Sequence, residues 1–162
     1  MYPKILKLKR FKDKRGFFYE IFNQNKYKNS IPKKFIEDDV SFSKKNVLRG
    51  FHGDHKTWKI ITCIYGKIQF AYINNKKNSK YYKENKSYIF NSTELNQIII
   101  PPSFGVAFLV LSDFALIHYK QSNYYKKNLQ FEISYNSPCL NFKWKSSKPT
   151  LSQRDLAAKP LS

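Results

Sequence analysis

The sequence has little of several residue types that mark common protein classes, with two cysteines, one methionine and five glycines in 162 residues. The two cysteines, Cys63 and Cys139, provide neither a disulfide framework nor a zinc site. The longest apolar stretch, residues 98–111, is interrupted by two prolines and is too short to span a bilayer. Residues 1–10 alternate lysine with apolar residues and lack the apolar core of a secretory signal. We therefore expect a cytoplasmic protein without a membrane segment.

Acidic residues and arginine are also scarce. The chain has 11 Asp and Glu against 30 Lys and Arg, of which four are arginine, and its formal charge is +19. Such a charge raises the question of nucleic-acid binding. The lysines are nevertheless spread along the whole chain, no nucleic-acid motif accompanies them, and arginine is the preferred base-reading side chain. We therefore predict a solvated basic surface and no nucleic-acid partner, although a positive field would also attract a small molecule that carries a diphosphate.

The residues that are abundant favour β structure. Aromatic residues make up 17% of the chain, whereas alanine is rare. Short strand-like segments recur at regular spacing, which indicates a sandwich or a jelly-roll barrel in one domain over residues 1–162. A tail from about residue 137 should be irregular, with a short helix near 152–158. The predicted strands are residues 2–9, 17–22, 35–43, 47–51, 57–65, 67–74, 80–90, 97–100, 104–111 and 115–121, with a turn at 13–16 and a short helix or loop at 23–30.

One segment carries the chemistry, and it reads Asn46-Val-Leu-Arg-Gly-Phe-His-Gly-Asp-His-Lys-Thr-Trp-Lys59. It places Arg49, His52 and Lys59 within eleven residues of strand-like sequence. An imidazole can remove a proton next to a carbonyl, and a fixed cation can stabilise the enolate oxygen that results. The segment therefore predicts an enzyme of proton transfer.

Seven segments in order resemble the dTDP-4-dehydrorhamnose 3,5-epimerase family and cover nearly the whole chain. They are residues 13–20, 46–52, 100–105, 108–113, 118–120, 123–125 and 151–155. The resemblance implies a mainly β, cupin-like jelly-roll barrel with a few short helices. It also implies a cofactor-independent enzyme that inverts C3, C5 or both in a nucleoside-diphosphate 4-keto-6-deoxy sugar, in bacterial surface polysaccharide (capsule) biosynthesis. Members of this family are generally homodimers, and the edge-like first strand could pair between subunits.

The resemblance also implies catalytic roles for four residues. His52 would be the base, and Asp155, in Leu-Ser-Gln-Arg-Asp, would accept the other N–H of the imidazole and orient the ring. Lys59 would stabilise the enolate oxygen. Tyr119 would return a proton from the opposite face of the sugar, because a base that returns its own proton regenerates the substrate.

Five further residues are expected to bind the substrate. Tyr125 resembles a second active-site tyrosine that lines the sugar site, and Arg49 would hold phosphate or sugar oxygens. Arg15, Phe18 and Glu20 resemble residues that contact the nucleotide, from one subunit into the site of its partner. A guanidinium suits a diphosphate, and a phenyl ring can stack on a base.

Strand geometry raises one difficulty for this site. Arg49 and His52 are three residues apart, so a regular strand would point them to opposite faces. A bulge near Gly50 or Gly53 would bring them to one side.

The chain departs from the family pattern at two places. Val106 stands where the family usually has a histidine near the sugar or phosphate. Residues 53–59 replace a longer, glutamine-containing segment and resemble a branch that acts on GDP-linked 4-keto-6-deoxy sugars, including heptoses. On this basis dTDP-rhamnose is not the expected product, and the nucleotide is left open among GDP, CDP and dTDP.

A metal site is not expected. His52 and His55 are spaced so that a regular strand would not direct both to one ion, and no glutamate follows at ligand distance. Two other functions stay open for the same fold. One is a sugar-nucleotide 3,4-ketoisomerase, which moves the carbonyl, and the other is a non-catalytic sugar-nucleotide-binding domain, which the valine at position 106 would suit.

Overall fold

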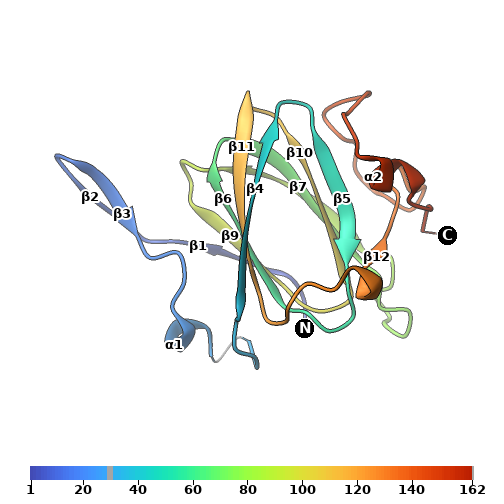
Figure 1. Ribbon diagram of the computed structural model, residues 1–162, viewed down its shortest axis with the longest axis horizontal. Coiled ribbons are helices and arrows are strands. Elements are labelled where there is room, and N and C mark those ends of the chain that lie inside the picture. The colour runs from blue at the N-terminus through green and yellow to red at the C-terminus, as the bar shows by residue number, and fades with distance from the viewer. Residues whose placement is uncertain (29–30, 162) are drawn as a thin grey trace.

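The computed structural model describes residues 1–28 and 31–161 (Figure 1). Its first strands and helix are β1 (Lys4–Lys7), β2 (Arg10–Asp13), β3 (Gly16–Tyr19), α1 (Gln24–Tyr27), β4 (Glu37–Lys44), β5 (Leu48–Gly53) and β6 (Lys59–Tyr65). The remaining elements are β7 (Lys67–Asn74), β8 (Asn85–Asn91), β9 (Asn96–Ile100), β10 (Phe104–Val110), β11 (Phe114–Gln121), η1 (Lys127–Leu129), β12 (Phe131–Glu132) and α2 (Gln153–Ala157).

Two five-stranded antiparallel sheets face each other and form the jelly-roll that the sequence predicts. One sheet has the order β1-β9-β6-β11-β4 and the other β12-β5-β10-β7-β8. Strands β2 and β3 pair with each other as a separate hairpin, which projects away from both sheets in Figure 1. β1 lies at the edge of its sheet, as expected.

The main core fills the space between the two sheets. Alternate residues of each strand point inward, so that Ile61 and Cys63 of β6 meet Phe70 and Tyr72 of β7 across the interior. Phe70 and Phe90 stack with ring centroids 5.2 Å apart. Burial in this apolar interior raises the pKa of the Cys63 thiol to about 12, so this cysteine is a packing residue and not a nucleophile.

Both sheets are also covered on part of their outer faces. The segment around α1 packs Tyr27, with Phe22, on Ile60 and Ile99 of the first sheet. The irregular tail packs Phe142 and Trp144 on the second sheet. Because the tail packs on this sheet, the C-terminal helix α2 lies beside β5, the strand that carries Arg49 and His52.

Most predicted strands are confirmed, and the differences lie at turns. The prediction for 67–74 matches β7, and the short helix near 152–158 matches α2. The predicted strand at 80–90 begins only at Asn85, because residues 80–84 form turns. The short elements β2, η1 and β12 were not predicted. Residues 29 and 30 of the segment predicted as helix or loop lie outside the described residues. In the described part of the chain no helix is long and apolar enough to cross a membrane.

Candidate active site

A bulge in β5 resolves the difficulty with Arg49 and His52. Along the β5–β10 ladder, His52 pairs with Val106 and Arg49 with Phe108, so the pairing shifts between these two positions. Gly50 adopts a φ of +102° at the bulge, and a Cβ there would lie 2.3 Å from the Val106 carbonyl oxygen. Only glycine fits this close approach. The bulge, predicted near Gly50 or Gly53, lies at Gly50 and lets both side chains line one cavity.

The cavity lies within the barrel and has a volume of about 450 Å³, in the usual range for small-molecule sites. His52 enters it from β5 and Tyr119 from β11, which belong to the two facing sheets. Lys59, Arg49, Tyr125 and Asp155 line the same cavity. Six of the nine predicted site residues therefore meet in one place.

His52 and Asp155 form the closest polar contact of the cavity. The imidazole Nε2 lies 2.7 Å from Oδ1 of Asp155, although its N–H does not point straight at that oxygen. The carboxylate is 3% exposed and is fixed by two further donors, the Ser152 hydroxyl at 2.7 Å and the Gly50 N–H at 3.2 Å. Burial alone would raise the pKa of Asp155, but the close contact with His52 and the bond from Ser152 hold it below its ordinary value. Asp155 is therefore an ionised group that can orient the ring.

Local structure explains why Asp155 is held so firmly. Ser152 is the N-cap of α2, and its hydroxyl accepts the backbone N–H of Asp155 at 3.1 Å while donating to the Asp155 carboxylate. The cap fixes both the start of the helix and the direction of the acid.

Lys59 opens β6 and is 7% exposed. Burial lowers the pKa of its ammonium group, and the nearby Arg154 acts in the same direction. Asp54, Asp39 and Glu37 oppose this shift through their negative charges. The charge of the Lys59 ammonium group in the cavity wall therefore depends on the charged groups around it.

Tyr119 faces the cavity beside Ser41 and Asp39 of β4. Burial raises the pKa of its phenol to about 12, and Asp39 adds to this, while Ser41 and Arg49 act in the opposite direction. The phenol therefore keeps its proton at neutral pH and can donate it.

Five polar residues that line the cavity were not among the predicted site residues. Arg154 donates from Nε to Glu132 at 2.5 Å and from Nη1 to the Tyr125 hydroxyl at 3.1 Å. Asp39 and Gln121 also line the cavity, and the Gln121 amide donates to Asp39 at 2.7 Å and to Glu37 at 2.8 Å. Gln130 and Ser41 complete this set. Alternation could have found several of them, since Ser41 and Gln121 lie two residues from other inward-facing positions of predicted strands.

Comparison with known proteins shows the family of the chain. The family profile described as dTDP-4-dehydrorhamnose 3,5-epimerase matches residues 3–162. The chain belongs to this family. It is 34% identical over 160 residues to the Salmonella typhimurium dTDP-4-dehydrorhamnose 3,5-epimerase, covering 95% of this chain and 87% of that protein. The Escherichia coli enzyme of the same name is 34% identical over 157 residues, covering 93% of this chain and 85% of the relative.

Solved structures of this epimerase family give the same fold. A dTDP-6-deoxy-D-glucose-3,5-epimerase from Legionella pneumophila, in complex with dTDP-4-keto-L-rhamnose, superposes with a TM-score of 0.93 at 32% identity, covering 98% of this chain and 87% of that one. A Bacillus anthracis dTDP-4-dehydrorhamnose 3,5-epimerase with bound TDP and PPi also gives 0.93, at 27% identity and coverage of 98% and 94%. These relatives are named for thymidine nucleotides, so the expected likeness to a branch acting on GDP-linked sugars and heptoses is not supported.

The departure from the family pattern at Val106 falls inside the cavity. Val106 lies on β10 directly opposite His52 and lines the same wall. An apolar side chain there offers no hydrogen bond to a substrate. The polar side chains of the cavity, among them those of His52, Lys59 and Tyr119, lie on the other positions of its wall.

The three residues expected to contact the nucleotide do not line the cavity. Arg15 lies at the tip of the β2–β3 hairpin and pairs with Asp13 at 2.5 Å. Phe18 is on β3 and is 69% exposed. Glu20 pairs with Lys26 at 2.6 Å. Within one subunit these residues therefore have no part in the cavity.

In the described part of the chain, no group of three or more His, Cys, Asp or Glu side chains is placed so that it could hold a metal ion. His52 contacts Asp155, whereas His55 lies on the loop after β5 and its Nδ1 is 3.0 Å from the Ser103 hydroxyl. The two histidines therefore contact different residues.

Proposed function

We propose that this protein epimerises a nucleoside-diphosphate 4-keto-6-deoxy sugar at C3, C5 or both. The observation that carries the proposal is the placement of an imidazole and a protonated phenol in one cavity, on facing sheets. Inversion of a carbon centre needs a base on one face and an acid on the other. The family to which the chain belongs carries the name of this reaction.

The first half of the reaction is assigned to His52. Its imidazole takes the proton from the carbon next to the C4 ketone, and the electron pair of that C–H bond moves to the ketone oxygen to give an enolate. Asp155 fixes the ring from behind through its 2.7 Å contact. The Lys59 ammonium stabilises the enolate oxygen, a type of interaction whose loss typically costs about a hundredfold or more in rate.

The second half is assigned to Tyr119. As the enolate collapses to the ketone, the carbon takes the phenolic proton from the face opposite His52. Burial keeps this proton in place until that step, with a phenol pKa of about 12. The positive charge of Arg49 stabilises the Tyr119 phenolate that forms in this step.

The proposed substrate is a dTDP-linked sugar. Arg49 and Arg154 line the cavity and carry planar guanidinium groups suited to phosphate oxygens. Tyr125, held by Arg154 through its hydroxyl, borders the sugar position. The thymidine nucleotide follows the names of the relatives, and the cytoplasm stays the predicted compartment.

We also propose a homodimer in which the β2–β3 hairpin serves the cavity of the partner. The hairpin carries Phe11, Phe17 and Phe18 at 50%, 54% and 69% exposure. Exposed aromatic residues clustered on a projecting element favour a protein interface. In such a dimer Arg15, Phe18 and Glu20 would reach the nucleotide of the other subunit.

Subunit mixing tests the dimer. An Arg15→Ala/Phe18→Ala double variant and a His52→Ala variant should each be weak alone and regain activity when unfolded together and refolded. Mixing His52→Ala with Asp155→Asn is the control, since both lesions lie in the cavity and each mixed cavity keeps one of them. Absence of recovery in the first mixture would assign the hairpin to its own subunit, and full activity of Arg15→Ala/Phe18→Ala alone would assign it to no site.

Solvent isotope exchange tests the reaction. Incubation of the protein with a dTDP-4-keto-6-deoxy sugar in D2O should place deuterium at C5, C3 or both, together with inversion. His52→Ala should abolish incorporation while circular dichroism stays unchanged. Full incorporation by this variant would remove His52 as the base.

A binding protein without catalysis is the second candidate, and Val106 is the observation that favours it. This candidate predicts that the sugar nucleotide raises the melting temperature while no deuterium enters the sugar. A 3,4-ketoisomerase would instead move the carbonyl to another carbon, and carbon-13 nuclear magnetic resonance of the product would show its new position.

A further inference from the structure

Lys59 stands in the cavity wall without a direct counter-ion. In the described part of the chain no carboxylate oxygen lies within 4 Å of its ammonium nitrogen, since all recorded ion pairs involve other residues. The side chain is 7% exposed. A buried lysine in this position tends to lose its proton unless fixed negative charge lies nearby.

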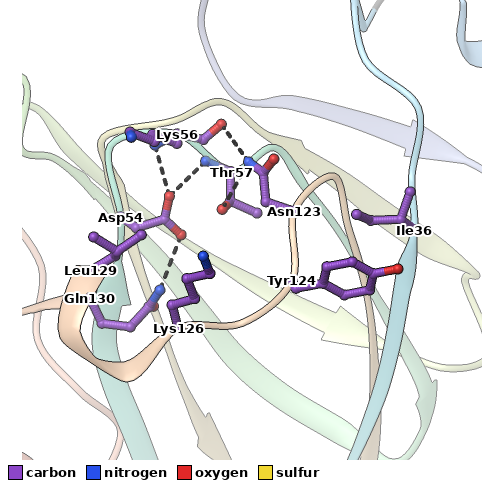
Figure 2. A pocket seen from close by; sticks show the side chains of 9 residues that line it. All are labelled: Ile36, Asp54, Lys56, Thr57, Asn123, Tyr124, Lys126, Leu129 and Gln130. Atoms are coloured by element: carbon purple, nitrogen blue, oxygen red, sulfur yellow. Dashed lines mark hydrogen bonds between the residues drawn. The ribbon is translucent and has the colours of Figure 1, made fainter.

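Asp54 provides such a charge from the loop between β5 and β6. Figure 2 shows its carboxylate at the centre of a small network. One oxygen accepts the backbone N–H groups of Lys56 at 2.8 Å and Thr57 at 2.6 Å, and the other accepts the Gln130 amide at 3.2 Å. Asp54 is 5% exposed, so its carboxylate is held largely out of solvent by these donors.

The network holds Asp54 ionised. Burial alone would raise the pKa of this carboxyl, but the N–H bonds of Lys56 and Thr57 keep it below its ordinary value. The same two bonds close the turn that leads directly into β6, where Lys59 is the first residue. Gln130 in turn lines the catalytic cavity, so Asp54 lies immediately behind the cavity wall.

We propose that Asp54 is a positioning residue whose fixed negative charge keeps the Lys59 ammonium protonated during the reaction. The proposal rests on the proposed function, in which Lys59 meets the enolate oxygen. Asp54 touches neither substrate nor reacting atoms and acts through Lys59.

Other charged groups also surround Lys59. Asp39 and Glu37 of β4 also act on it, but they share the Gln121 amide, and Glu37 further accepts the Tyr125 N–H. Arg154 of α2 acts in the opposite direction. The remaining titratable groups of the cavity are His52, Asp155, Tyr119, Tyr125 and Arg49. Asp54 differs from these acids because three donors fix it at the turn that leads directly into Lys59.

The consequence is a shift in the alkaline limit of activity. Lys59 must be protonated to stabilise the enolate, so the rate falls as pH rises through its pKa. The Tyr119 phenol, with a pKa of about 12, titrates later and does not set this limit. Removal of the Asp54 charge should therefore move the limit to lower pH.

Asp54→Asn is the variant of choice. The amide oxygen can still accept both backbone N–H groups, and the Gln130 amide can turn to offer its oxygen, so the turn keeps its shape while the charge is lost. The alkaline limb of the pH–rate profile for deuterium incorporation should shift to lower pH by about one unit. At a given pH on that limb, this shift is a tenfold loss of rate. Activity near neutral pH and the melting temperature should change little. Asp38→Asn is the matched control, since Asp38 lies on the outer face with His118 and Lys120 and should leave the limb in place.

Two results would overturn the role of Asp54. One is an unchanged limb in a folded Asp54→Asn protein, and the other is an equal fall in rate at all pH values. Should this variant unfold, Asp54→Ser is measured instead, because a hydroxyl can accept the same N–H groups. Lys59→Met separates the two proposals: if it keeps full exchange, the proposed function loses its enolate donor, whereas if it abolishes exchange while Asp54→Asn shows no shift, only the inference about Asp54 fails.

Discussion

His52 and Asp155 meet at 2.7 Å although one lies on β5 and the other on the last helix of the chain. The tail that packs on the outer face of the second sheet brings them together. The carboxylate is tied to Ser152 and to the Gly50 N–H, so its position is set by the helix cap and by the bulge at once.

Replacing Asp155 by Asn should reduce turnover strongly while leaving the fold intact. The amide would offer His52 a donor in place of an acceptor and favour the wrong tautomer of the ring. We expect a fall in kcat on the order of 10² to 10⁴ with a smaller change in KM. Steady-state kinetics check this, with Ser152→Ala as a milder control that loses the cap but keeps the acid. A kcat within twofold of the wild type would contradict the assigned role.

The stability that Asp155 contributes should depend on pH in a defined direction. Its folded-state pKa is below the ordinary value, whereas in the unfolded chain it is about 3.9. The contribution is therefore present in full above that ordinary value and is lost as pH falls through the lower, folded pKa. Urea unfolding of wild type and Asp155→Asn should differ in free energy at pH 7 and converge at strongly acidic pH. A difference that grows with acidity would have the wrong sign.

Replacing Tyr119 by Phe should separate the two halves of the reaction. His52 can still remove and return the proton from its own face, but the opposite face has no acid. We expect net inversion to fall by about 10²- to 10⁴-fold. Loss of label from a substrate deuterated at the reacting carbon should be less affected. Nuclear magnetic resonance follows both processes in one sample, and inversion at the wild-type rate would exclude Tyr119 as the acid.

Replacing Gly50 by Ala should destabilise the protein and damage the site. The new Cβ would lie 2.3 Å from the Val106 oxygen and 2.9 Å from the Ala107 Cα, in a backbone with φ of +102°. We expect a loss of roughly 2 kcal/mol or more in unfolding free energy. Gly16→Ala is the matched control, because Gly16 also has a positive φ of +136° but nothing lies within 4 Å of its added Cβ. Equal effects in the two variants would show that the close approach at the bulge does not matter.

The strands could be predicted because alternation and turns are local features of the chain. Within β6 and β11, Lys59 and Tyr119 occupy inward positions that follow from a period of two. The same rule failed for Arg49 and His52, since the bulge depends on how closely the Val106 carbonyl approaches Gly50. The rule also says nothing of Arg154, which enters the cavity from a helix at the far end of the chain.

The amino-acid order by itself determined the β architecture, the inward face of each regular strand and the chemical groups available for proton transfer. These follow from side-chain periodicity and from residue identity. Only the tertiary structure decided which further groups meet, namely Arg154 against the Tyr125 hydroxyl and Gln130 against Asp54. Distance and burial, which set charge and orientation in a cavity, arise from the packing of segments far apart in the chain and have no local pattern.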